Sequence, residues 1–162
     1  MNNDGLKRAA VFCILQCQEQ YLLLKRAKQP NVGKYVPVGG KIDPYESPES
    51  AVVREIMEET GIHIPRPKFS GVLIETSPTS YNWISFIYKA DIDFVPPPYC
   101  DEGELFWISA GDLKNLDTPP TDHHIYMFIK AEQPFVFSAV YDENLVLLEM
   151  YDRLSGNRLE TK

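Results

Sequence analysis

The chain has 162 residues, 44% of them hydrophobic, which fits one globular domain with a substantial core over residues 1–162. Its formal net charge of −7 excludes a general nucleic-acid-binding surface, because no basic stripe is available to neutralise a phosphate backbone. No run of about eighteen apolar residues occurs, and the three cysteines have no metal-binding spacing. We therefore expect one soluble, cytoplasmic domain with reduced thiols and no membrane contact.

The first forty residues have the composition of β-strands. Three segments are rich in strand formers: Arg8–Cys17, Tyr21–Arg26 and Tyr35–Val38. The polar residues 18–20 join the first two as a hairpin, and a loop over 29–34 precedes the third. Arg26, at the end of the second strand, faces either solvent or a phosphate. The third strand leads into a turn that we predict at Gly39 and Gly40.

The residues after the glycine pair predict a helix from about Pro48 to Thr60. Ser47 supplies a capping hydroxyl, Pro48 suits the first helical position, and Gly61 is placed to end the helix. Apolar residues recur between these ends at helical spacing: Ala51, Val52, Ile56 and Met57.

Three glutamates on this helix share or border one face: Glu55, Glu58 and Glu59. Taken alone, they have an ordinary alternative explanation as a solvated helix face. The adjacent glycine pair favours a metal site, because glycines allow close approach to a phosphate. Oxygen ligands suit Mg²⁺, with Mn²⁺ as a second candidate. Glu46 and Arg54 can form an ion pair that holds the loop against the helix.

The stretch from Gly40 to Ile62 carries these residues at fixed spacings. Five residues separate Gly40 from Glu46, and seven more precede Arg54. The chain then continues with Glu55, Ile56, a free position, Glu58, Glu59, a free position, Gly61 and Ile62. This pattern resembles the signature of the Nudix hydrolases at every specified position.

The resemblance implies a fold and a set of roles. The fold is the α/β Nudix fold, an α/β/α sandwich with a mixed central sheet, in which the motif helix and the C-terminal helix cover opposite faces. Glu55, Glu58 and Glu59 are expected to hold the metal, and Glu46 and Arg54 to support the site. Four further residues are expected to contact the substrate: Arg26, Gly39, Gly40 and Lys41.

The second half of the chain continues with strands and two helices. Strands are predicted over Phe69–Thr76, Trp83–Asp91, Glu104–Ser109, Phe135–Tyr141 and Leu145–Tyr151. The proline-rich residues 94–103 are predicted to form a surface loop. A short helix capped by Ser109 and a longer one from about Thr118 to Glu132 complete the predicted elements.

Two acids in this half extend the resemblance to the MutT-like nucleotide-pool branch. Members often carry a glutamate about five residues before a strand tryptophan, as a metal ligand or general base, and Glu102 precedes Trp107 in this way. Glu104 is its competitor, because strand alternation can turn either side chain inward. Asp122 matches one of the acids with which mammalian-type 8-oxo-dGTP diphosphatases bind the purine. It either accepts hydrogen bonds from a guanine-type edge or stabilises the helix start.

This chain also departs from those diphosphatases. Proline and threonine replace the aromatic residue before Asp122, and Val36 stands where an asparagine assists base binding. The resemblance therefore implies magnesium-dependent cleavage of a nucleoside triphosphate, such as 8-oxo-dGTP, to the monophosphate and pyrophosphate. Two alternatives are hydrolysis of a nucleotide sugar, ADP-ribose or dinucleotide, and a non-catalytic nucleotide sensor. The oligomeric state is open, a homodimer included.

Overall fold

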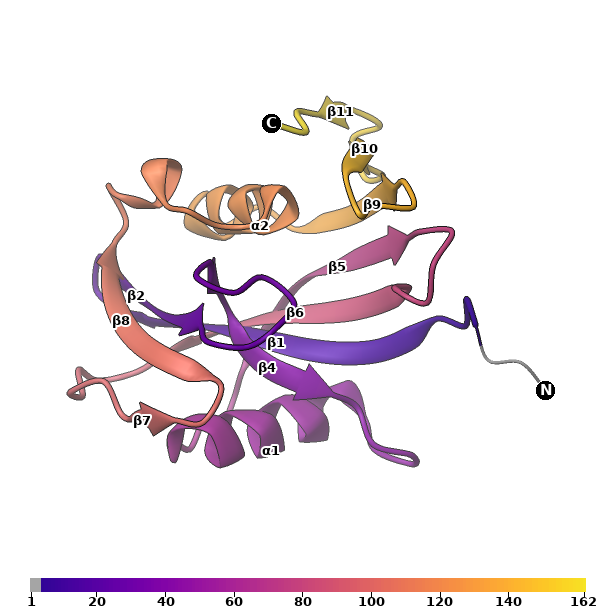
Figure 1. Cartoon of the computed structure of the whole chain (residues 1–162). Coiled ribbons are helices and arrows are strands. Elements are labelled where there is room, and N and C mark those ends of the chain that lie inside the picture. The colour runs from indigo at the N-terminus through magenta and orange to yellow at the C-terminus, as the bar shows by residue number, and fades with distance from the viewer. Residues whose placement is uncertain (1–3) are drawn as a thin grey trace.

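One mixed β-sheet with a helix on each side organises the described part of the chain, residues 4–162 of the computed structural model. Helix α1 (Pro48–Thr60) lies on one side of the sheet and helix α2 (Pro120–Lys130) on the other (Figure 1). The short 3₁₀ helix η1 (Leu113–Asn115) precedes α2. This arrangement confirms the predicted α/β/α sandwich. No helix in residues 4–162 is long and apolar enough to cross a membrane.

The sheet contains eleven strands within the described residues. They are β1 (Arg8–Cys17), β2 (Gln20–Arg26), β3 (Tyr35–Val36), β4 (Val38–Lys41), β5 (Lys68–Thr76), β6 (Trp83–Asp91), β7 (Tyr99–Cys100), β8 (Gly103–Ser109), β9 (Phe135–Tyr141), β10 (Leu147–Asp152) and β11 (Arg158–Leu159). Their spatial order is β11-β10-β9-β5-β6-β1-β2-β8-β7, with β3 beside β2 and β4 beside β1. The pairs β1–β6 and β5–β9 are parallel, and the others are antiparallel.

Strand β1 changes its partner along its length, which places the glycine motif beside α1. Its first half pairs with β4, in register Phe12 to Gly39 and Val11 to Gly40, whereas residues 15–17 pair with β2. Strand β4 also packs against α1. The fork in the sheet therefore brings the residues around Gly40 next to the glutamates of the helix.

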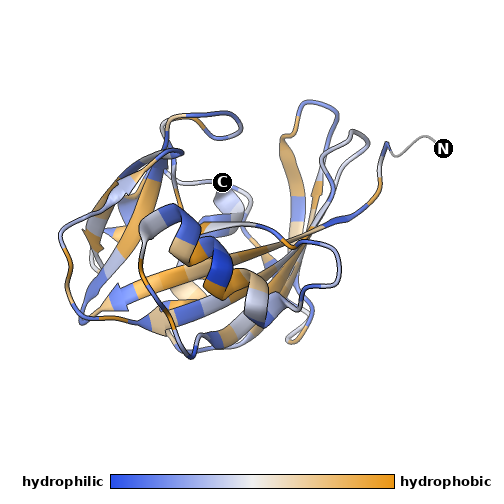
Figure 2. Ribbon diagram, turned by 90° about the horizontal axis from the view of Figure 1, so that it is seen from below, coloured by the Kyte–Doolittle hydropathy of each residue, from blue (hydrophilic) through white to orange (hydrophobic). Residues whose placement is uncertain are grey.

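Side-chain alternation along the strands separates two hydrophobic cores. On β1, Val11, Cys13 and Leu15 join the core under α1, and Ile14 joins the core under α2. The α1 core also includes three residues of the helix itself, Ala51, Val52 and Ile56. Figure 2 shows this side of the molecule, with largely orange strands behind a helix that alternates between orange and blue.

The local signals at both ends predicted α1 correctly. The Ser47 hydroxyl accepts a hydrogen bond from the Ser50 backbone N–H at 3.1 Å. Gly61 ends the helix in the left-handed conformation, with φ of 72°, and its N–H donates to the Met57 carbonyl at 2.9 Å. A serine cap of this kind contributes roughly 0.5–2 kcal/mol to helix stability.

The predicted glycine turn is wrong. Gly39 and Gly40 lie inside β4, and the strand predicted over Tyr35–Val38 is divided between β3 and β4. A Cβ atom at Gly39 would overlap the Val11 carbonyl oxygen and the Phe12 backbone. Glycine is therefore needed for close approach of two strands rather than for a change of chain direction.

Four elements predicted in the second half also need correction. The loop over 94–103 ends earlier, because Tyr99–Cys100 pairs with β8. The helix predicted to be capped by Ser109 is reduced to η1, which follows Asp112. Helix α2 is shorter than predicted, since Pro119 is its N-cap and Ala131 its C-cap. Strand β10 begins at Leu147, and Leu145, with a φ of 60°, lies in the connection before it. Strand β11 was not predicted.

Candidate active site

Arg54 is the centre of a charged network on α1. Its guanidinium contacts four carboxylates: Glu46 at 2.7 Å, Glu55 at 2.9 Å, Glu58 at 3.2 Å and Asp43 at 3.5 Å. It also donates to the Lys41 carbonyl at 3.1 Å. The hydrogen bond from Arg54, followed by one from the Asp43 backbone N–H, lowers the pKa of Glu46 to about 2. The structure thus contains the Glu46–Arg54 pair, within a network wider than the sequence indicated.

Glu55 is buried between α1 and β4, with 9% of its surface exposed. A Cβ atom at Gly40 would overlap the Glu55 carboxylate, so the missing side chain at position 40 makes room for it. Burial raises the pKa of Glu55; the hydrogen bond from Arg54 opposes this rise, and the charges of Glu58 and Glu59 add to it. A cation beside Glu55 would offset both the burial and the repulsion.

The other two helix glutamates have different surroundings. Glu58 is exposed and accepts a hydrogen bond from Arg54 Nη1 through its Oε2. Glu59 is half-buried and accepts a hydrogen bond from Cys100 Sγ at 3.2 Å. Within residues 4–162, no three His, Cys, Asp or Glu side chains converge closely enough to hold a metal ion. The three glutamates are therefore neighbours on the helix whose carboxylates turn toward Arg54 and Cys100.

The chemistry of this donor set nevertheless fits a hard divalent cation. Four carboxylates surround the single guanidinium of Arg54, and the charge of Glu59 also acts on Glu55. All the donors are oxygen atoms, which Mg²⁺ and Mn²⁺ prefer over the nitrogen and sulfur ligands typical of zinc. Glu55, Glu58 and Glu59 are the residues that would hold such an ion.

Glu102 lies on the β7–β8 hairpin and is paired with two cations. Its carboxylate contacts Lys28 Nζ at 3.4 Å and Arg26 Nη2 at 3.7 Å, and no hydrogen bond in the described residues joins it to the α1 glutamates. Glu104, its competitor, is exposed. Arg26 also donates to the carbonyl of Pro30 at 2.7 Å, so it fixes the loop that follows β2.

A cavity of about 540 Å³ connects β4 with the start of α2. All five residues that the sequence analysis assigned to substrate binding line it: Arg26, Gly39, Gly40, Lys41 and Asp122. Strands β5 and β6 contribute Leu73, Glu75, Trp83, Ser85 and Ile87 to the lining. Tyr141 at the end of β9 and Leu145, between β9 and β10, complete it. Lys41 has no ion pair within the described residues, so its ammonium group is available to an anionic ligand.

Two acids share the part of this cavity next to α2. Glu75 accepts hydrogen bonds from Tyr141 at 2.7 Å and from Tyr81 at 3.2 Å. Burial raises the pKa of Glu75, and the two tyrosines oppose the rise. Burial, together with the negative charge of Glu75, raises the pKa of Asp122 to about 8, against a single hydrogen bond from the Thr121 hydroxyl. At neutral pH, Asp122 is therefore mainly a protonated carboxyl group, which can both donate and accept.

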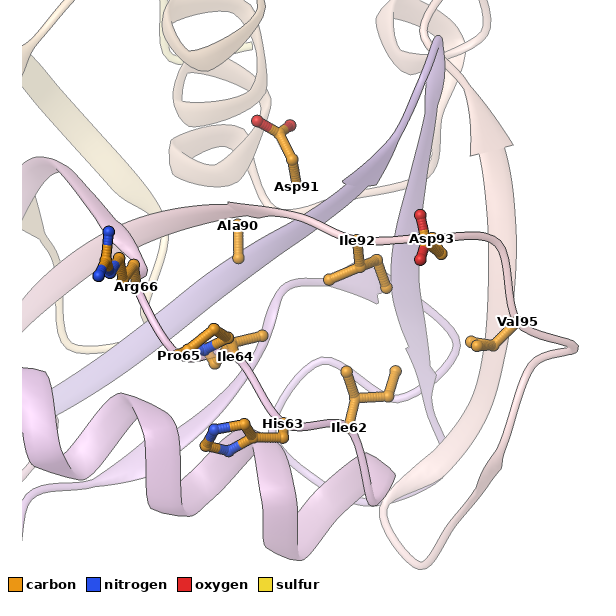
Figure 3. A pocket seen from close by; sticks show the side chains of 10 residues that line it. All are labelled: Ile62, His63, Ile64, Pro65, Arg66, Ala90, Asp91, Ile92, Asp93 and Val95. Carbon is orange, nitrogen blue, oxygen red and sulfur yellow. The ribbon is translucent and has the colours of Figure 1, made fainter.

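A second cavity, of about 530 Å³, lies away from these residues. Its walls are the segment Ile62–Arg66 after α1 and, at and beyond the end of β6, residues 90–93 and Val95 (Figure 3). None of its lining residues belongs to the Arg54 network or to the acid pair of Glu75 and Asp122. Gly40 and Lys41 of the motif thus line the first cavity, whereas Arg54 and the glutamates of α1 line neither of the two cavities.

The sequence matches the family model of the NUDIX domain over residues 5–128. The chain belongs to the Nudix family. The match contains the complete motif from Gly40 to Ile62, the Arg54 network and Asp122, but it ends before β9. Tyr141 and Leu145 thus complete the Nudix cavity from outside the matched region.

Three similar proteins include one named as a Nudix hydrolase and one named for a substrate. The chain is 34% identical over 126 residues to the uncharacterized Nudix hydrolase YvcI of Bacillus subtilis, covering 75% of this chain and 78% of YvcI. It is 44% identical over 120 residues to an ADP-ribose pyrophosphatase of Methanocaldococcus jannaschii, covering 70% and 67% respectively. The crystal structure of a MutT protein from Bacillus halodurans has a TM-score of 0.79 at 24% identity, covering 91% and 98%, and shows the shared fold.

Sequence reasoning missed the residues that surround Asp122. Glu75 was assigned only to a strand, and Tyr81 and Tyr141 had no assigned role. Tyr141 lies 66 residues from Glu75 in sequence and reaches it because β9 pairs with β5 in parallel. A buried acid on the α2 side of β5 breaks the apolar alternation, and this was the one available signal.

Proposed function

We propose that this Nudix hydrolase is a magnesium-dependent pyrophosphohydrolase that converts a purine nucleoside triphosphate to the monophosphate and pyrophosphate. One observation carries the proposal: the cavity lined by Gly40, which abuts the Glu55 carboxylate, is also lined by Glu75 and Asp122. A nucleotide needs two such neighbouring regions, because its phosphates and its base require different partners. The acid pair would supply hydrogen-bonding groups for a base, and Gly40 abuts Glu55, one of the three proposed metal ligands.

The phosphate region combines cations with the motif glutamates. Lys41 and Arg26 line the same cavity as Gly40, where their positive charge would offset that of the phosphates. Glu55, Glu58 and Glu59 would hold magnesium, which when bound neutralises phosphate charge and lowers the pKa of an attacking water.

Two glutamates are candidates to accept the proton of the attacking water. Glu58 is exposed, and only its Oε2 is engaged, by Arg54. Glu102 is already paired with both Arg26 and Lys28, which favours Glu58 as the acceptor. Glu102→Gln is therefore expected to lower kcat less than Glu58→Gln does. The reverse order, measured at saturating magnesium, would assign the proton transfer to Glu102.

The base region favours a purine with a polar edge. A guanine-type base presents N7 and O6 as acceptors and N–H groups as donors. Protonated Asp122 can donate to such an acceptor, and its carbonyl oxygen can accept from an N–H group. Glu75 is kept as an acceptor by two tyrosine hydroxyls. Trp83 offers an indole ring in the same cavity against which a base can pack.

A substrate panel tests this proposal. Purine triphosphates, 8-oxo-dGTP, pyrimidine triphosphates and ADP-ribose are incubated with magnesium, and the products are identified by chromatography. Purine triphosphates should give monophosphate and pyrophosphate with the highest kcat/KM. Asp122→Ala should reduce this value by roughly ten- to a hundredfold for purines and leave pyrimidines nearly unchanged, because an unpaired buried polar group is costly. Equal losses for both classes would remove Asp122 from base recognition.

ADP-ribose hydrolysis is the second candidate. The relative that is 44% identical is an ADP-ribose pyrophosphatase, and ADP-ribose also joins a purine to a diphosphate. The products separate the two activities, because ADP-ribose yields AMP and ribose phosphate without free pyrophosphate. A kcat/KM for ADP-ribose above that of every triphosphate would replace the first proposal with the second.

A further inference from the structure

Glu59 differs from the other helix glutamates in what holds it. Glu55 and Glu58 both contact Arg54, whereas the described residues provide Glu59 with one hydrogen bond, from Cys100 on β7. The thiol is the donor of this bond, and the carboxylate oxygen is the acceptor. The Sγ to Oε2 distance is 3.2 Å, and Oε1 of Glu59 has no hydrogen bond to the described protein.

The position of Cys100 is fixed by its surroundings. The thiol is 5% exposed and belongs to the hydrophobic core that also contains Val52 and Ile56 of α1. Its strand ends in a tight hairpin, in which Cys100 pairs with Gly103. A Cβ atom at Gly103 would overlap the Lys25 carbonyl oxygen, so the hairpin lies directly against β2. A donor held this rigidly restricts the rotamers of the glutamate that it contacts.

We propose that Cys100 is a positioning residue for metal binding, which fixes one oxygen of Glu59 and leaves the other for the cation. The inference rests on the proposed role of Glu59 as a metal ligand. Partners of this kind orient metal ligands in many proteins, and their loss typically weakens metal affinity about 10–100-fold. A thiol is a weak donor, so we expect an effect near three- to tenfold here.

The chain offers a matched control in Cys13. This residue is also a buried, free cysteine of the same core, but it lies on β1 and has no hydrogen bond to a motif glutamate. Cys13→Ala and Cys100→Ala each remove one buried sulfur atom. Comparing them separates loss of packing, which both variants share, from loss of the bond to Glu59.

The experiment measures Mg²⁺ and Mn²⁺ binding by calorimetry without substrate, alongside the magnesium dependence of hydrolysis. Cys100→Ala should raise the metal Kd by about three- to tenfold while kcat at saturating metal stays within about twofold. Cys13→Ala should lower the melting temperature and leave the Kd unchanged. Cys100→Ser keeps a hydroxyl donor and should recover part of the affinity, and it serves if Cys100→Ala fails to fold.

Identical metal affinities in wild type, Cys13→Ala and Cys100→Ala would overturn the inference. Equal weakening in both alanine variants would also overturn it, because that result assigns the effect to packing. The substrate proposal fails separately: if the protein hydrolyses no purine triphosphate but Cys100→Ala alone weakens metal binding, the role of Cys100 stands and the substrate assignment falls.

Discussion

The Cα atom of Gly40 lies against the carboxylate of Glu55, with no room for a side chain between strand β4 and helix α1. A Cβ atom added at position 40 would come within 2.5 Å of the carboxylate carbon of Glu55. Because Gly40 pairs with Val11 inside the sheet, the strand cannot move aside without loss of this pairing. The first glycine of the Nudix motif thus determines where its first helix glutamate sits.

Gly40→Ala should therefore displace Glu55 and lower kcat. A shift of about 1 Å in a catalytic group can cost about a hundredfold in rate, and we expect a loss of that order. Gly111→Ala is the control, because the nearest atom to its added Cβ is the Ser109 hydroxyl at 3.9 Å, an ordinary contact. Wild-type turnover in Gly40→Ala at saturating magnesium would show that the Glu55 position is not critical.

Glu58→Gln and Glu59→Gln should each lower kcat by several orders of magnitude without unfolding the protein. The amide preserves the shape of the side chain but removes the charge that holds the cation, which stabilises the transition state by several kcal/mol. Glu143→Gln, at an exposed position between β9 and β10, is the matched control. More than about a tenth of wild-type turnover in both variants would contradict the metal assignment, since a tenfold loss is only about 1.4 kcal/mol.

Arg54→Ala should lower the melting temperature as well as the activity, because it leaves Glu46, Glu55 and Glu58 without their shared partner. The stability effect should depend on pH. The folded-state pKa of Glu46 is about 2, below its ordinary value near 4.3, so its contribution is complete above that ordinary value. It disappears as the pH falls toward about 2.

Thermal denaturation of wild type and Arg54→Ala between pH 7 and pH 2.5 measures this dependence. The difference in melting temperature should be largest above about pH 4.5 and should narrow toward pH 2.5. Arg54→Lys keeps the positive charge but loses the planar set of donors. Its melting temperature should therefore lie between those of wild type and Arg54→Ala. Lost activity with an unchanged melting temperature would instead indicate that Arg54 contacts the substrate phosphates.

Asp122 should make the folded protein less stable as the pH rises from about 4 to about 8. Its pKa is raised to about 8 in the folded state, against about 3.9 in an unfolded chain, so the folded protein binds the extra proton in this window. Asp122→Asn has no such proton, and its melting temperature should rise relative to wild type across the window and then level off. For Asp93→Asn, a substitution at an exposed position, the difference in melting temperature from wild type should not change with pH. If the melting-temperature difference between Asp122→Asn and wild type does not change with pH, the Asp122 carboxylate lies in a solvated environment.

The sequence predicted those parts of the molecule that depend on local signals. Helix α1 is delimited by Ser47 and Gly61, which are adjacent to its two ends. The spacing of its glutamates was enough to predict that they are neighbours on the helix. The structural role of the glycine pair could not be predicted, because two glycines are equally compatible with a sharp turn and with close contact between strands. The hydrogen bond between Tyr141 and Glu75 could not be predicted either. It depends on the parallel pairing of β5 and β9, which no local sequence pattern encodes.

Strand β9 lies inside the sheet, between β5 and β10, yet it falls beyond residue 128, where the family match ends. The wall that Tyr141 and Leu145 add to the cavity is therefore separable in sequence from the motif helix and β4. If the cavity holds the base as proposed, grafting residues 141–146 between Nudix chains should change base selectivity while the motif residues stay constant. Such chimaeras must retain Phe135, Phe137 and Ala139, because these residues fill the core under α2 and anchor the transplanted segment.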